Sequence, residues 1–215
     1  MNEVLLRTMT GVLMVFVALT AQWFGGTVFA VFVAAIAVVI YHEWLGITRG
    51  WGVGWRLSGF FYALVPALSL LWVQERAGQP FVDKGSALVL WIFTVTWATD
   101  IGAFFAGRTF GGPRLAPSIS PNKTISGLAG GVIAATLLAG IWARANDLSL
   151  MWLVLAPLFA LAAAASDLFE SWMKRKAGVK DSGTLIPGHG GVLDRLDGLI
   201  PVAALTAVAV MAGLS

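Results

Sequence analysis

The sequence predicts an all-α, polytopic integral membrane protein with about seven transmembrane helices, its N-terminus inside the cell and its C-terminus outside. Hydrophobic residues make up 58% of the chain and charged residues 12%, whereas soluble domains average about 45–50% and about 25%. Several apolar runs approach the roughly 20 residues that a helix needs to cross the hydrocarbon layer. The basic residues gather between alternate runs, which is typical of a membrane protein with a fixed orientation.

Seven apolar segments carry the predicted helices, and the second needs Trp44 and Leu45 at its end to reach the length of a span. No small-residue cleavage site follows the first segment, so we expect a retained helix rather than a cleaved signal. A single membrane domain, residues 1–215, accounts for the whole sequence. The segments are Thr8–Phe24, Thr27–Tyr41, Leu57–Val73, Ser86–Ala106, Gly127–Ala143, Leu150–Ala165 and Gly198–Leu214.

Lysine and arginine are distributed unevenly between the two sides of the predicted bundle. With the N-terminus inside, eleven of the 14 basic residues fall in inner segments, and only Arg76, Lys84 and Arg144 fall in outer ones. The positive-inside rule therefore favours this orientation. Orientation and contact with anionic membrane lipids explain the net charge of +3, so nucleic acid is not an expected partner. The absence of cysteine excludes disulfides and thiolate metal sites.

A stripe of small residues runs along the predicted fifth helix. Gly127, Gly131, Ala135 and Ala139 recur every four residues, so they share one face of a helix. Such a face lets a second helix approach closely. We interpret the stripe as a packing surface and assign it no chemistry.

Two inner loops, residues 107–126 and 167–197, are long and rich in Gly, Pro and ionisable side chains. Long loops in a compact protein are usually functional or disordered. These loops are therefore the segments in which we expect the chemistry of the protein.

The second of these loops offers oxygen ligands for a hard cation. Asp167 follows an Ala-rich apolar run, and if that helix continues, Ser171 lies one turn beyond it with Glu170 between them. Asp194 and Asp197 form a second acidic pair, three residues apart. Carboxylate and hydroxyl oxygens are the ligands that Mg²⁺ prefers. A carboxylate at the end of a membrane run is also costly unless it is paired, hydrated or bound to a metal.

Basic side chains in the same loop carry the charge that suits phosphate groups. The orientation rule explains a single Lys or Arg here equally well, and Glu170 with Lys174 also fits an ordinary i,i+4 pair on a solvated face. The loop thus combines oxygen ligands for a metal with cations for a polyphosphate at the membrane surface. The basic residues are Lys174, Arg175, Lys176, Lys180 and Arg195.

The run from Ser166 to Asp197 resembles the signature of the phosphatidate cytidylyltransferases, also called CDP-diacylglycerol synthases. It begins S-D-L-F-E-S-W-M-K-R and ends K-D-S-G-T-L-I-P-G-H-G-G-V-L-D-R-L-D. The similarity covers nearly every fixed position of a long pattern, so a chance match is negligible.

Two further segments resemble the same family, T-D-I-G-A-F-F-A-G-R-T-F-G at Thr99–Gly111 and S-P-N-K-T-I-S-G at Ser120–Gly127. Relatives often carry Glu where this chain has Ser126, so no carboxylate role is carried over to that position. The resemblance implies a catalytic part in residues 91–215. Residues 1–90 would contribute N-terminal helices and carry no recognisable motif.

The resemblance implies a nucleotidyltransferase of phospholipid biosynthesis that converts CTP and phosphatidic acid into CDP-diacylglycerol and pyrophosphate with Mg²⁺. It implies a multi-pass protein of the bacterial inner (plasma) membrane with its active site facing the cytoplasm. Asp167 and Asp194, assisted by Ser171, would bind one or two cations. Asp197 would either join them as a ligand or cap the final helix.

The resemblance also implies contacts with the substrates. Asn122 and Lys123 would contact nucleotide or lipid phosphate, and Asp100 would be a further metal ligand or the partner of a base. The other residues assigned to catalysis, four of them as cations for phosphate oxygens, are Lys174, Arg175, Lys180, Arg195, Asp181 and His189.

Two other functions fit part of the sequence. An ion or solute transporter could use Asp100 and Asp167 to line a pathway, but it would more often show broken half-helices in related repeats. A CDP-alcohol phosphotransferase would carry a D-G-x-x-A-R pattern, which is absent. The sequence leaves the oligomeric state open, with a homodimer as one alternative.

Overall fold

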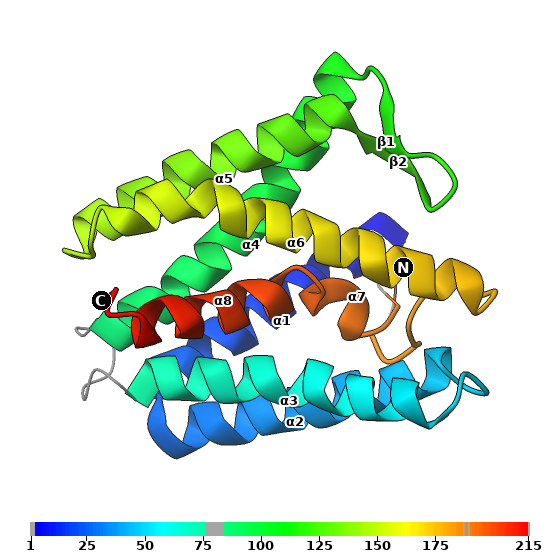
Figure 1. Cartoon of the computed structure of the whole chain (residues 1–215), viewed down its shortest axis with the longest axis horizontal. Helices are drawn as coiled ribbons and strands as arrows, with labels where there is room; N and C mark the ends of the chain where they lie inside the picture. The colour runs from blue at the N-terminus through cyan, green and yellow to red at the C-terminus, as the bar shows by residue number, and fades with distance from the viewer. Residues whose placement is uncertain (1–2, 76–83, 187, 189, 215) are drawn as a thin grey trace.

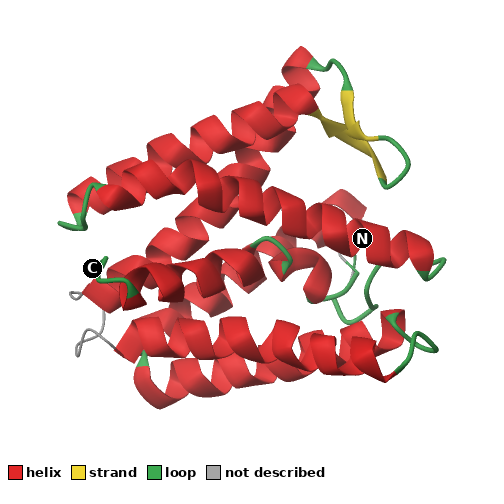
Figure 2. Ribbon diagram, viewed as in Figure 1, coloured by secondary structure: helices red, strands yellow, loops and turns green. Residues whose placement is uncertain are grey.

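The structure is a computed structural model that describes residues 3–75, 84–186, 188 and 190–214. Helices dominate the described chain, and a single hairpin of two short strands interrupts them (Figure 2). The elements, in chain order, are α1 (Glu3–Phe24), α2 (Gly26–Ile47), α3 (Val53–Glu75), α4 (Lys84–Phe110), β1 (Arg114–Ala116), β2 (Ser120–Thr124), α5 (Ile125–Ala145), α6 (Met151–Lys176), α7 (Leu193–Leu196) and α8 (Leu199–Met211).

All seven predicted apolar segments are helical, which confirms an α-helical membrane protein. Among the described residues, five helices (α2 to α6) are long and apolar enough to cross a membrane. The first and last predicted spans, Thr8–Phe24 and Gly198–Leu214, contain shorter apolar helices over Thr8–Phe24 and Leu199–Met211.

The predicted loop boundaries need correction at two places. Helix α6 continues to Lys176, so the first part of the expected loop 167–197 is helical. Helix α4 likewise continues to Phe110, and the rest of the loop 107–126 contains the β1–β2 hairpin. The reason is that polar residues extend both helices beyond the apolar stretch, where hydropathy alone cannot locate the helix end.

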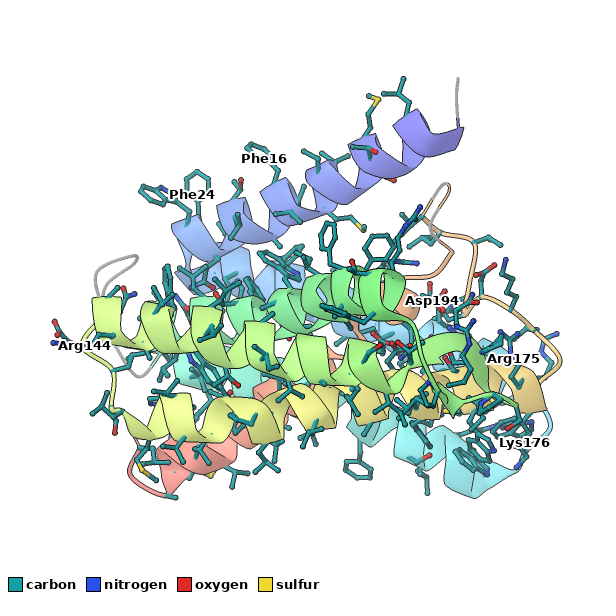
Figure 3. The ribbon with its side chains drawn as sticks, turned by 90° about the horizontal axis from the view of Figure 1, so that it is seen from above. Phe16, Phe24, Arg144, Arg175, Lys176 and Asp194 are labelled. Atoms are coloured by element: carbon teal, nitrogen blue, oxygen red, sulfur yellow. The ribbon has the colours of Figure 1, made fainter. Side chains whose placement is uncertain are left out.

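The segments predicted to be inside lie together at one end of the bundle (Figure 1). These are the α2–α3 turn, the hairpin and the loop between α6 and α7, whereas the α5–α6 turn and the C-terminus lie at the opposite end. Figure 3 likewise shows Arg144 far from Arg175 and Lys176. The arrangement therefore separates the basic end of the molecule from the end that is poor in charge.

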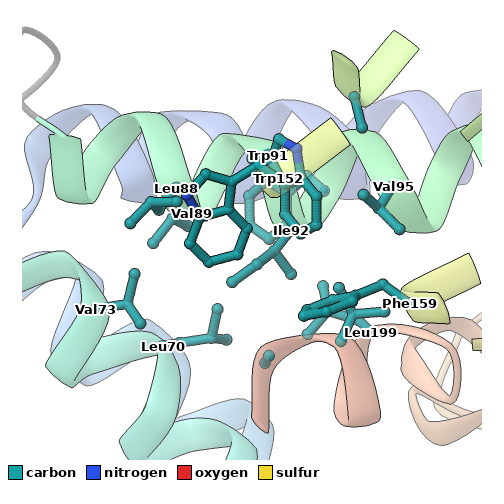
Figure 4. Packing of buried hydrophobic residues seen from close by; sticks show 14 of the residues in the cluster. Leu70, Val73, Leu88, Val89, Trp91, Ile92, Val95, Trp152, Phe159 and Leu199 are labelled. Carbon is teal, nitrogen blue, oxygen red and sulfur yellow. The ribbon is translucent and has the colours of Figure 1, made fainter. Parts of the chain in front are cut away.

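The main core joins α4 and α6 to α3 and α8 (Figure 4). Trp91 and Trp152 are fully buried, and their ring centroids lie 4.9 Å apart in an edge-on contact. A second, smaller core packs Trp44 of α2 with Met173 of α6 and Leu193 of α7. This second core lies beneath the loop that joins α6 to α7, so it links the N-terminal helices to the segment with the most ionisable residues.

Helices α4 and α5 touch through their backbones, which confirms that the small-residue stripe is a packing surface. Gly131 is buried, and a Cβ atom placed on it would lie 2.7 Å from the carbonyl oxygen of Thr99. A Cβ atom on Gly102 would lie 2.7 Å from the carbonyl oxygen of Gly130. Helix α5 begins at a standard N-cap, because Thr124 Oγ1 accepts the N–H of Gly127 at 3.0 Å.

Candidate active site

Five carboxylates gather at the basic end of the bundle and form what we call the acidic cluster. They come from α4, α6 and the segment around α7. Asp197 interacts electrostatically with Asp167, Glu170 and Asp100, and Glu170 interacts with Asp194. Helix α6 brings Asp167 and Glu170 to neighbouring positions because it continues into the segment that was expected to be a loop. The cluster therefore unites residues that are distant in the sequence.

A cleft of about 650 Å³ opens beside the acidic cluster. It brings together four of the predicted site residues from α4, β2 and α6, and Lys123 forms an ion pair with Asp167 across it. Carboxylates and cations thus face the same space, as a site for a metal–polyphosphate complex requires. The charged and amide side chains that line the cleft are Asp100, Arg108, Arg114, Asn122, Lys123 and Asp167.

Lys174 lies inside the acidic cluster. Its Nζ atom is 2.6 Å from Asp194 Oδ1 and 3.0 Å from Glu170 Oε1. The side chain of Lys174 is 13% exposed and that of Glu170 2%, so this i,i+4 pair is buried and does not lie on a solvated face. Here Lys174 points at carboxylates, and its contact with phosphate stays a prediction.

Asp194 accepts hydrogen bonds with both of its carboxylate oxygens. Oδ1 accepts from Lys174, and Oδ2 accepts from the backbone N–H groups of Ser182 at 2.9 Å and Gly191 at 2.8 Å. Burial alone would raise the pKa of this carboxyl, but contacts with Glu170 and Lys174 and the two backbone hydrogen bonds lower it to about 2. Asp194 is therefore ionised and fixed to the loop before α7.

Asp197 has the opposite environment. Burial raises its pKa well above the ordinary value, and the negative charges of Asp167, Glu170 and Asp100 raise it further. Its Oδ1 atom accepts the N–H of Gly198 at 2.8 Å, at the start of α8. The N-cap residue of α8 is Gly198 and has no side-chain cap bond, so Asp197 contacts the residue before the helix and does not make the predicted cap. The crowding of like charges around Asp197 suits a cation.

The other predicted site residues that the structure describes lie around the acidic cluster and the cleft. Arg175 Nε donates to the carbonyl oxygen of Ile119 at 3.3 Å, which joins the end of α6 to the hairpin. Arg195 on α7 is exposed and interacts electrostatically with Asp100. Ser171 is half-buried on α6, Lys180 and Asp181 are exposed on the loop that follows α6, and His189 lies outside the described residues.

Sequence reasoning missed three charged residues near the site. Arg108 and Arg114 line the cleft, although the sequence analysis used them only for orientation. Arg108 lies within Thr99–Gly111, one of the segments that resemble the family, and this position could have assigned it to the site. The third residue is Glu43 on α2, which accepts hydrogen bonds from the loop before α7. The sequence feature that could have indicated Glu43 is a carboxylate within a predominantly apolar helix.

Ser126 does not take part in the charged site. Its Oγ atom donates to the carbonyl oxygen of Gly111 and lies 3.0 Å from Thr124 Oγ1. This side chain therefore links the end of α4 to the beginning of α5.

Comparison with known proteins identifies similar sequences. The family described as "Cytidylyltransferase family" matches residues 49–212. A phosphatidate cytidylyltransferase of Brucella suis biovar 1 (strain 1330) is 37% identical in an alignment 256 residues long, gaps included, which spans 95% of this chain and 92% of the relative. One of Rickettsia typhi is 33% identical over 213 residues, covering 94% and 90%. One of Haemophilus influenzae is 44% identical over 179 residues, covering 73% and 62%.

Proposed function

Because the chain belongs to the cytidylyltransferase family and is a nucleotidyltransferase, we propose that it joins the CMP unit of CTP to phosphatidic acid and releases pyrophosphate. The relatives from Brucella, Rickettsia and Haemophilus bear the name phosphatidate cytidylyltransferase, which supports the lipid substrate. The main structural support is the cleft in which Lys123, Arg108 and Arg114 lie beside Asp100 and Asp167. It combines cations for phosphate with acids for a metal.

In the proposed reaction a phosphatidate oxygen attacks the α-phosphorus of CTP. The new oxygen–phosphorus bond forms as the bond to the leaving pyrophosphate breaks. The attacking oxygen is already anionic near neutral pH, so no strong general base is needed. Positioning and charge neutralisation therefore supply most of the catalysis. Lys123, Arg108 and Arg114 would hold phosphate oxygens and reduce the repulsion between the two substrates.

The residues present fit Mg²⁺. Glu170 Oε2 is buried without a hydrogen-bond partner in the described structure, whereas Oε1 is paired with Lys174. Burial, and then the negative charges of Asp167, Glu170 and Asp100, raise the pKa of Asp197. Within the described ranges, no three acidic or histidine side chains form a ready-made metal site. One or two carboxylates with substrate phosphates usually suffice for Mg²⁺. Bound Mg²⁺ would neutralise triphosphate charge, held by Asp167 and Asp194 with Ser171 nearby.

The reaction can be tested with purified protein, radiolabelled CTP, phosphatidic acid and Mg²⁺. We expect label to appear in chloroform-soluble lipid and pyrophosphate to be released in equal amount. Omitting phosphatidic acid, or removing divalent cations with excess chelator, should abolish both products. Incorporation that persists after chelation would remove the metal from the mechanism. Absence of labelled lipid under every condition would refute the proposed reaction.

We further propose that the acidic cluster faces the cytoplasm of a bacterial cell, where CTP is available. The protein has no cysteine, so single cysteines can report its orientation. In intact inverted and right-side-out vesicles, an impermeant thiol reagent should label Ser118→Cys only from the cytoplasmic side and Ala145→Cys only from the other. Both positions are exposed. The reverse pattern would overturn the orientation.

A further inference from the structure

We propose that Glu43, near the end of α2, is a positioning residue for this reaction, because it holds the loop that leads into α7, the helix that carries Asp194. Glu43 is 5% exposed, and its carboxylate accepts three hydrogen bonds. Oε2 accepts from Ser182 Oγ at 3.0 Å and from the backbone N–H of Leu193 at 2.8 Å, and Oε1 accepts from the N–H of Val192 at 3.0 Å. Ser182, in the first part of this loop, and Val192 and Leu193, where the loop meets α7, are therefore attached to one side chain of α2.

The loop closes tightly around this carboxylate. A Cβ atom on Gly191 would lie 2.5 Å from Glu43 Oε2, and one on Gly183 would lie 2.7 Å from Glu43 Oε1. No side chain fits at either glycine without displacing the carboxylate. The hydrogen bonds and the close approach of the backbone together define a socket that is specific for the end of Glu43.

Ser182 connects the socket to the acidic cluster. Its hydroxyl donates to Glu43, while its backbone N–H donates to Asp194 Oδ2 at 2.9 Å. Asp194 in turn contacts Lys174 on α6 at 2.6 Å. The loop is thus held between two carboxylates, Glu43 on one side and Asp194 on the other. A displacement at Glu43 would move the backbone that positions Asp194.

The socket requires a carboxylate because each of its two oxygens accepts a backbone N–H, which can only donate. A glutamine has the same length, but its amide nitrogen would oppose one of the three donors and leave that donor unsatisfied. An aspartate keeps the charge but is shorter by one methylene. Glu43 also lies outside residues 49–212, the range matched by the family, so its role follows from the contacts in this structure.

Hydrogen–deuterium exchange and steady-state kinetics of Glu43→Gln test the inference. Losing a hydrogen bond to a charged group should speed exchange in peptides covering residues 182–194 by about ten- to a hundredfold. Peptides from α5 should be unchanged. The kcat should fall about tenfold or more while the KM for CTP changes less, because the cleft residues are untouched. Glu43→Asp should recover part of kcat.

Two further variants make the test specific. Ser182→Ala removes one of the three hydrogen bonds, and adding it to Glu43→Gln should lower kcat little further, because both changes release the same loop. His42→Ala, an exposed neighbour on α2, should leave kcat and exchange unchanged. Additive losses from Glu43→Gln and Ser182→Ala would contradict coupling through the loop.

The kinetic arm rests on the proposed reaction, whereas the exchange arm does not. Faster exchange confined to residues 182–194 supports the positioning role even if the substrate differs from phosphatidic acid. Faster exchange throughout the protein would show that Glu43 only stabilises the fold and would overturn the inference. Unchanged exchange at residues 182–194 would overturn it as well.

Discussion

Replacing Asp167 with Asn is expected to lower the rate of CDP-diacylglycerol formation by about a hundredfold or more, the size of loss seen when a transition-state electrostatic contact is removed. Asp167 lines the cleft and forms an ion pair with Lys123. The amide keeps the shape of the side chain but removes the charge that would hold a magnesium–triphosphate complex. Initial rates with labelled CTP, at equal amounts of folded protein, measure the effect.

Lys123→Gln separates two roles for Asp167. If Asp167 binds the metal, Asp167→Asn should raise the Mg²⁺ concentration needed for half-maximal rate, and Lys123→Gln should not. Equal Mg²⁺ dependence in both variants would mean that Asp167 serves only to orient Lys123. Asp147→Asn is the matched control, because Asp147 is exposed on the α5–α6 turn and its φ of 52° suits Asn. That variant should retain its activity.

Replacing Asp194 with Asn is expected to cause a loss of similar size, again about a hundredfold or more. Part of this loss would come from displacement of the loop before α7, because the two oxygens of Asp194 accept hydrogen bonds from Lys174, Ser182 and Gly191. An amide nitrogen in either position would face a donor. The pKa of about 2 lies below the ordinary 3.8, so the ionised carboxylate stabilises the fold above about pH 4, and this stabilisation is lost as pH falls through about 2.

The double variant Asp167→Asn/Asp194→Asn decides whether the two residues act on one cation. Residues that act as a unit are strongly non-additive, so we expect the double variant to be little worse than either single variant. Losses that multiply would place Asp167 and Asp194 in separate steps or sites. Near-normal synthesis by either single variant would refute the shared site. A folded-state control by thermal unfolding excludes simple misfolding.

The helices and part of the site were predictable because they depend on apolar runs and on spacing within a single helix. Apolar runs located α2 to α6, since a helix in lipid must be apolar over its whole span. Helical spacing also placed Asp167, Glu170 and Lys174 near one another on α6. Local spacing could not predict which of these side chains are buried. The pair of Glu170 and Lys174 was equally consistent with a solvated face, and only packing against Asp194 buries it.

The partners across the site could not be predicted, because loop conformation and helix packing determine them. Lys123 meets Asp167 across 44 residues of sequence, and Glu43 meets Leu193 across 150. No periodicity relates residues at such separations. The hairpin that carries Lys123 was also absent from the prediction. It follows α4 without a strongly alternating pattern, and β2 contacts α5 and α6, which the sequence does not indicate.

The backbone contact between α4 and α5 has a consequence for how the site responds to its bilayer. Asp100 follows Thr99, whose carbonyl oxygen faces Gly131, and Lys123 directly precedes the cap of α5. Peptide groups in contact therefore set the spacing between the backbone positions that carry these two charges, and a peptide group has no rotamers to change. Membranes of different thickness change the tilt of a helix. We expect α4 and α5 to tilt as one body, so that the backbone positions of Asp100 and Lys123 keep a constant separation.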